Sequence, residues 1–120
     1  MNNYATRFLG HVVHIKIDRT MGSAHPDYGF MYPVNYGYVE NVFAPDNEEL
    51  DAYILGIETP INDFTGRCIA VLHRLDDDDD KLIIVPDGLT LTDDQIMNQV
   101  NFQEQYFKTA ILRRTEDTPV

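Results

Sequence analysis

Residues 32–55, "YPVNYGYVENVFAPDNEELDAYIL", set an aromatic segment beside a group of carboxylates. Residues 37–43 and 51–55 are strand-like, because aromatic, β-branched and other apolar side chains dominate both pieces. Between them, the Pro-Asp-Asn sequence at 45–47 is typical of a turn. The stretch therefore predicts two short strands joined by an acidic turn.

The same strand signal returns on both sides of this stretch. Residues 11–18, "HVVHIKID", alternate apolar and polar side chains, as a half-buried strand does. Further strand-like pieces lie at 67–74 and 81–85, and residues 109–114 are a candidate last strand. Short strands at regular intervals favour an all-β barrel or sandwich over βαβ units.

One segment has the pattern of a helix. Thr92 with Gln95 forms a capping-box signal, and the two aspartates between them suit the positive end of the helix dipole. Apolar residues recur at helical spacing from Ile96 onward, so residues 93–107 are expected to lay one apolar stripe on the sheet. Residues 115–120 read as a loose tail. The predicted fold class is mainly β (α+β), with one packed helix.

Length and composition point to one globular domain over residues 1–120. The hydrophobic fraction of 43% is ordinary for a folded protein. No apolar run is long enough to cross a bilayer, and the first ten residues lack the layout of a signal peptide, so no membrane partner is expected. Cys68 is the single cysteine and lies among apolar residues. It reads as a buried thiol, which predicts a reducing, cytoplasmic location.

The charge balance bears on partners. Twenty acidic residues against nine basic ones give a net charge of -11. Such a chain repels a polyanion, so direct binding of nucleic acid is not expected. Divalent cations are the obvious partners. For most of these carboxylates, the alternative is that they only keep the protein soluble.

Two acidic clusters are candidates for cation binding. The first surrounds the turn before 51–55 and includes Asp46, Glu48 and Asp51. Crowded carboxylates repel one another and need a positive ion, and Mg²⁺ suits a few carboxylates with water completing its octahedron. The alternative is a solvent-exposed acidic turn, because short carboxylate patterns arise often by chance.

The second cluster is the run of five aspartates at 76–80, followed by Lys81. An EF-hand loop would need glycine where Lys81 stands, so a calcium loop of that type is excluded. What remains is a hairpin that joins 67–74 to 81–85, with acidic side chains at its solvated bend. Lys81 follows as a cation able to contact phosphate. The four histidines have no paired spacing, which argues against zinc.

Together, these stretches resemble the soluble family I inorganic pyrophosphatases. "YPVNYGYV" followed by "DNEELDAYIL" is similar to that family's Tyr-Pro-x-Asn-Tyr-Gly segment and its acidic signature. The order continues with an acidic hairpin carrying Asp-x-Lys, a Val-Pro exit and a helix with a late tyrosine, and the resemblance covers residues 11 to 108. It implies a small OB-like closed β-barrel with one packed C-terminal helix, and hydrolysis of pyrophosphate with Mg²⁺, Mn²⁺ being the alternative.

The resemblance also assigns roles to individual residues. It makes Glu48 the group that orients or deprotonates the attacking water, where the family has aspartate. The implied metal ligands are Asp46, Asp51, Asp79 and either Asp76 or Asp77. The implied phosphate contacts are Tyr36, Lys81, Tyr106 and Lys108, with Lys108 displaced by one residue from the family's position. Among these, Asp46, Glu48 and Lys81 are the expected catalytic residues.

Departures from the family leave alternatives open. The family's early lysine and arginine have no secure counterparts, and Arg19 is the first choice among Lys16, Arg19 and His25. The substrate would arrive as magnesium pyrophosphate, so the acidic protein needs no net positive charge. One alternative is a metal-dependent hydrolase of another phosphoanhydride or phosphate ester, either a nucleotide or a phosphorylated metabolite. Another is a degenerate, non-catalytic family member. Relatives commonly form homo-oligomers, so a homo-oligomer is a candidate state.

Overall fold

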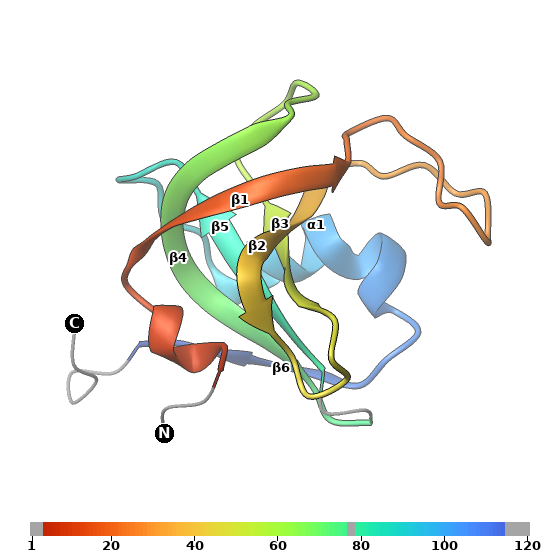
Figure 1. Ribbon diagram of the computed structural model, residues 1–120. Helices are drawn as coiled ribbons and strands as arrows, with labels where there is room; N and C mark the ends of the chain where they lie inside the picture. Colours follow the sequence, from red (N-terminus) through yellow and green to blue (C-terminus); the bar gives the residue numbers. More distant parts are fainter. Residues whose placement is uncertain (1–3, 77–78, 115–120) are drawn as a thin grey trace.

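The computed structural model describes residues 4–76 and 79–114, and Figure 1 shows its elements. The strands are β1 Val12–Arg19, β2 Asn35–Phe43, β3 Glu49–Ile54, β4 Asp63–Arg74, β5 Asp80–Val85 and β6 Thr109–Leu112. The helices are the short 3-10 turn η1 Thr6–Phe8 and α1 Asp93–Glu104. Asp77 and the tail expected at 115–120 lie outside the described residues.

The sheet closes on itself as a barrel. Its strand order is β1-β2-β3-β5-β4, and β1 also pairs with β4, which closes the ring; β6 adds to the free edge of β4. The first part of β4 pairs with β1 and its last part with β6, so this long strand curves around the barrel (Figure 1). All pairs are antiparallel except β3–β5. The predicted OB-like closed barrel with one packed helix is confirmed.

Two apolar layers form because successive residues of a strand point to opposite faces. Ile54, Leu82 and Ile84 belong to the cluster inside the barrel. Their neighbours Tyr53 and Ile83 belong to a second cluster, outside the barrel wall, which includes apolar residues of α1. Strand β5 is thus buried on both faces, which explains its unbroken apolar run.

Helix α1 begins as expected and ends early. Thr92 is its N-cap, and the capping box with Gln95 is present in both directions. Ile96 and Val100 are fully buried against the barrel wall. The prediction of a helix to residue 107 was wrong by three residues, because the chain turns after Glu104 and leads back to β6, which pairs with β4.

Sequence reasoning also placed several strand starts too late. Strand β3 begins at Glu49 rather than at 51, and β5 begins at Asp80 rather than at 81. Strand β2 begins at Asn35 rather than at 37, and β4 begins at Asp63 rather than at 67. The first residues of β4, "DFTG", lack an apolar pattern because they gain their partners only from β1 when the barrel closes. The turn η1 was not predicted. Among the described helices, none is long and apolar enough to cross a bilayer.

Gly37 allows β1 and β2 to approach closely. A Cβ atom at this position would overlap the carbonyl oxygen of Lys16 and contact Ile17, both in the backbone of β1. Backbone atoms cannot rotate away as a flexible side chain can. The glycine of the "NYG" segment is therefore required by the packing of the barrel wall.

We expect Gly37→Ala to lower the free energy of unfolding by about 2–3 kcal/mol, the upper part of the range for overpacking. Urea unfolding followed by circular dichroism measures this value. Glu40→Ala, at an exposed position of the same strand, is the matched control and should stay within about 0.5 kcal/mol of the parent. A Gly37→Ala protein as stable as Glu40→Ala would contradict the close approach.

Candidate active site

A cleft of about 830 Å³ opens on the outer face of the barrel, beside the C-terminal end of α1. Its floor is built by Tyr36 of β2, Asp51 of β3, Lys81 of β5 and Arg74 of β4. These four strands are neighbours in that order, so one row across the barrel wall supplies the polar floor. The loop between β1 and β2 and the segment after α1 form the rim.

Lys81 lies at the centre of this floor. It is 3% exposed, and its Nζ donates to Asp51 Oδ2 at 2.7 Å and to Asp79 Oδ2 at 2.8 Å. The parallel register pairs Asp51 with Lys81, and Asp79 precedes Lys81 by two residues, which places all three side chains on one face. Burial opposes the charge of Lys81, but the two carboxylates more than offset this effect and raise its pKa. The ammonium therefore stays charged through the neutral range.

Tyr36 covers one side of the lysine. Its ring centroid is 5.9 Å from Lys81 Nζ, and it packs edge-on against Tyr53 at 4.8 Å. Burial, followed by the charge and hydrogen bonding of Asp51, raises the pKa of Tyr36 well above its usual value. Its hydroxyl is thus a hydrogen-bond donor at neutral pH.

Arg74 is a cation of the cleft that sequence reasoning missed. Its Nε and one terminal nitrogen donate to the two oxygens of Glu104 at 3.0 and 2.8 Å, and its other terminal nitrogen lies 3.7 Å from Asp79 Oδ2. The guanidinium carbon lies 3.7 Å from the ring centroid of Phe107. Burial opposes the charge of Arg74, yet Glu104 more than compensates and the pKa of Arg74 is raised.

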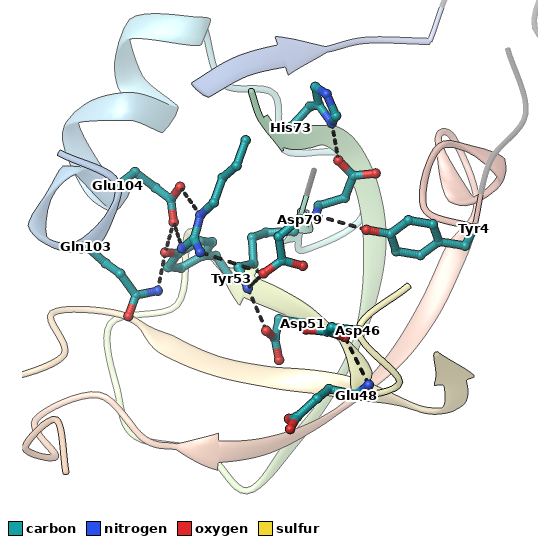
Figure 2. A network of polar contacts seen from close by, with 12 residues as sticks. Tyr4, Asp46, Glu48, Asp51, Tyr53, His73, Asp79, Gln103 and Glu104 are labelled. Atoms are coloured by element: carbon teal, nitrogen blue, oxygen red, sulfur yellow. Dashed lines mark hydrogen bonds and ion pairs between the residues drawn. The ribbon is translucent and has the colours of Figure 1, made fainter. Parts of the chain in front are cut away.

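Glu104 connects this arginine to the helix. It is 1% exposed and also accepts from the Tyr53 hydroxyl at 2.6 Å, while Gln103 donates to the same hydroxyl at 2.6 Å (Figure 2). The sequence contains a signal that Glu104 is buried, because Glu104 follows Ile96 and Val100 at intervals of four residues and so lies on the apolar stripe of the helix. A carboxylate on a buried stripe needs a cationic partner.

Asp46 and Glu48 lie on the exposed turn between β2 and β3, and they are not among the residues that line the cleft. The Glu48 backbone N–H donates to Asp46 Oδ1 at 3.0 Å, and Asn47 between them has a φ of 71°. In the view of Figure 2, the carboxylate of Glu48 points to the same side of the turn as that of Asp51. The turn thus leads into β3, which carries Asp51, and its two acidic residues stay outside the cleft lining.

The structure distributes the other predicted residues between the rim and the hairpin. Arg19 and Tyr106 line the cleft, and Tyr106 is 70% exposed. Asp76 Oδ1 accepts from the backbone N–H of Lys108 at 2.7 Å, which ties the hairpin to the segment after α1. Asp77 lies outside the described residues.

Asp80 departs from the expected solvated bend. It is 1% exposed, and its Oδ1 lies 2.6 Å from His73 Nδ1, while its backbone N–H donates to the Tyr4 hydroxyl at 3.0 Å. The register places His73 directly opposite Asp80 at the start of β5. For Asp80 the solvated-tip interpretation was wrong, because strand pairing continues into the aspartate run.

The carboxylates of the floor fit a divalent cation in part. Within residues 4–76 and 79–114, no three His, Cys, Asp or Glu side chains gather as a metal site. Asp51 and Asp79 do converge on one point, the ammonium of Lys81, and their side chains keep 34% and 22% exposure. Two carboxylates suit Mg²⁺, which keeps several waters and takes further oxygens from a phosphate.

Comparisons with known proteins find related sequences. The family model described as inorganic pyrophosphatase matches residues 12–117. The inorganic pyrophosphatase of Streptomyces coelicolor is 39% identical over 59 residues, which is 46% of this chain and 36% of that protein. The one from Campylobacter jejuni is 37% identical over 79 residues, 62% of this chain and 42% of that protein. The chain thus spans less than half the length of these relatives.

Solved structures share the fold. The inorganic pyrophosphatase of Helicobacter pylori superposes with a TM-score of 0.66 at 18% identity, covering 98% of this chain and 89% of that chain. The enzyme from Thermus thermophilus gives a TM-score of 0.65 at 20% identity, covering 86% of this chain and 83% of that chain. The barrel and its helix are therefore the architecture of these proteins.

We expect Glu104→Ala to lower the free energy of unfolding by about 3–5 kcal/mol, because it removes the bidentate partner of the buried Arg74. Thermal and urea unfolding measure the loss. Asn101→Ala, at an exposed position of the same helix, is the control and should change stability by about 0.5 kcal/mol or less. Equal stability of the two variants would mean that Arg74 needs no carboxylate from α1.

Proposed function

Because the chain belongs to the inorganic pyrophosphatase family, we propose that it hydrolyses inorganic pyrophosphate to two phosphates with Mg²⁺. The observation that carries this proposal is the floor of the cleft. One buried ammonium lies between two carboxylates, with a guanidinium and a protonated tyrosine beside it. Such a set can hold both a cation and the phosphate that the cation accompanies.

The basic side chains of the cleft would bind the phosphate oxygens. Lys81 and Arg74 are positioned by buried or half-buried carboxylates, and Arg19 lines the same cleft. Positive charge fixed before the substrate arrives stabilises the charge on the leaving phosphate without further reorganisation. The hydroxyls of Tyr36 and Tyr106 would donate hydrogen bonds to it. Lys108 remains a further predicted contact, and its backbone is held by Asp76.

Asp51 and Asp79 would hold the divalent cation, with Asp46 and one of Asp76 and Asp77 as further predicted ligands. When bound, Mg²⁺ neutralises phosphoryl oxygens and makes water a better nucleophile. Mg²⁺ is the first choice because hard carboxylate oxygens and retained water suit it, and Mn²⁺ is the alternative. The substrate would arrive as its magnesium salt, which suits a protein with a net charge of -11.

Glu48 would accept the proton of the attacking water. It lies on the turn that leads to Asp51, and its side chain is exposed. In the proposed mechanism this side chain would turn towards a water above the floor. Asp46 accepts the backbone N–H of Glu48 and so would fix the turn as well as offer an oxygen to the cation. A homo-oligomeric state and a cytoplasmic location remain predictions.

Asp51→Asn should reduce phosphate release from magnesium pyrophosphate by about 100-fold or more, because it removes a cation ligand at the centre of the site. Lys81 keeps Asp79 as a partner, so the fold should be retained. A colorimetric phosphate assay, with circular dichroism alongside, tests both points. Asp63→Asn makes the same chemical change at an exposed residue outside the cleft lining and should keep full activity. Equal rates for the two variants would remove Asp51 from the mechanism.

Glu48→Gln should lower kcat by about 10²- to 10⁴-fold and leave KM nearly unchanged, as expected for the loss of a general base. Steady-state kinetics at saturating Mg²⁺ separate the two parameters. Glu40→Gln, at another exposed glutamate, is the control. A rise in KM without a fall in kcat would instead assign Glu48 to substrate or metal binding.

A further inference from the structure

The rim of the cleft carries aromatic side chains to which the proposed hydrolysis of pyrophosphate, apart from the contact of Tyr106, gives no role. His25, Tyr28 and Phe30 of the β1–β2 loop, and Tyr106 after α1, all line it. Tyr28 is 80% exposed and Tyr106 is 70% exposed. Single exposed aromatics are common on protein surfaces, but several around one polar cleft are typical of a ligand-binding site.

The loop that presents these rings is rigidly built. The backbone N–H groups of Asp27 and Tyr28 both donate to His25 Nδ1, at 3.1 and 3.2 Å. The backbone N–H of His25 donates to the backbone carbonyl of Phe30 at 2.6 Å, which closes the loop into a tight turn. Phe30 in turn packs edge-on against Phe102 of α1 at 5.8 Å. The tip is therefore fixed to the helix rather than free in solvent.

Within this tip, the rings form a surface for a planar group. The centroid of His25 lies 4.9 Å from that of Tyr28 and 4.7 Å from that of Phe30, and the planes of Tyr28 and Phe30 are within 9° of each other. Phe30 contacts α1, and His25 accepts the backbone N–H groups of the tip, whereas the ring of Tyr28 is exposed to solvent. Rings that are held in place before a ligand arrives lose little entropy when the ligand stacks on them.

The floor and the rim belong to one cleft of about 830 Å³. That size lies in the range of pockets that enclose a drug-sized molecule. Pyrophosphate would contact the floor and the other phosphate-binding residues named above, and it would leave the rings of the loop at 25–30 unused. A phosphate chain that carries an aromatic base would use both parts, with the base on the rim. The exposed carboxylate of Asp27, also in the lining, could accept from a sugar hydroxyl or a base amino group.

We propose that the cleft also takes nucleoside di- and triphosphates, with the base stacked on Tyr28 and the phosphates on Lys81 and Arg74, an inference that rests on the proposed function of the floor. The terminal phosphorus is attacked by water, and its bond to the bridging oxygen breaks. The electron pair stays on that oxygen of the leaving nucleotide, and the proton of the water passes to Glu48. A triphosphate gives a diphosphate and phosphate, and a diphosphate gives a monophosphate and phosphate.

The test compares kcat/KM for ATP, ADP, inorganic triphosphate and pyrophosphate, all with Mg²⁺, in the parent protein, Tyr28→Ala and Tyr28→Phe. ATP and ADP should be cleaved about tenfold or more better than inorganic triphosphate, which shares the phosphate chain but has no base. Tyr28→Ala should lower the nucleotide values by about tenfold to hundredfold, the usual effect of losing one stacking ring. It should leave pyrophosphate within twofold, and Tyr28→Phe should restore nucleotide cleavage. Phe43→Ala, an exposed apolar residue outside the cleft lining, should change none of the values.

Several results would overturn the proposal. The first is a kcat/KM for nucleotides no higher than that for inorganic triphosphate. The second is a Tyr28→Ala variant that cleaves nucleotides as well as the parent does. The third is a Tyr28→Ala variant that loses the same factor in kcat/KM for every substrate. Light scattering that shows an oligomer dissociated by Tyr28→Ala would make the rim a subunit interface instead. Failure of the proposed function has a different signature, namely a parent protein that releases no phosphate from pyrophosphate. In that case calorimetry with Mg²⁺ and the β,γ-methylene analogue of ATP decides the inference, since absence of Tyr28-dependent binding would overturn it.

Discussion

The ammonium of Lys81 between Asp51 and Asp79 is the interaction on which the cleft depends. It joins β3 to β5, a parallel pair of the barrel wall, at the floor of the cleft. A buried ion pair adds little to stability, because desolvation of the charges consumes most of their attraction. Its role here is to position charged groups. It holds the ammonium of Lys81 at hydrogen-bond distance from two carboxylates, in a position open to the cleft.

The same contact would couple the binding of the magnesium ion to the binding of the phosphate groups of the proposed substrate. The carboxylates that now accept from Lys81 are those that would hold a divalent cation. If Asp51 and Asp79 held a cation, they would hold the ammonium of Lys81 less tightly, and that ammonium would be available to phosphate. Binding of magnesium and binding of phosphate would thus favour each other through a single side chain. Arg74 forms the second layer of this arrangement, because Glu104 anchors it to α1 while its other side lies near Asp79.

Sequence reasoning recovered the barrel because each strand carries its own signal. Alternation marks β1, the apolar run marks β5, and the capping box marks the start of α1. Asp51 was named because it belongs to the acidic signature that the sequence shares with the family, and Asp79 and Lys81 were named because they match the family's Asp-x-Lys pair. The start of β4 could not be predicted, because its polar residues become a strand only when β1 lies beside them.

The parts of the site that escaped prediction are those made by contacts between distant segments. In the sequence, Arg74 is the polar last residue of a strand. Only the folded structure brings Glu104 of α1 and Phe107, which follows α1, into contact with it. Asp80 reads as one of five equivalent aspartates, and only the register with His73 separates it from the others. The sequence alone gives only weak signals for such residues, because their roles depend on which residue of a distant segment packs beside them.

The barrel also explains how a short chain can present such a site. Tyr36, Asp51, Lys81 and Arg74 come from four strands that are neighbours in the order β2, β3, β5 and β4. Their relative positions are therefore set by backbone hydrogen bonds of the wall rather than by long loops, and strands place side chains more accurately than loops do. Loops contribute instead to the rim, where the aromatic tip at 25–30 is fixed to α1. Under the proposals above, such a scaffold would separate two tasks: the wall would act on the phosphate, and the loop would determine which group the phosphate carries.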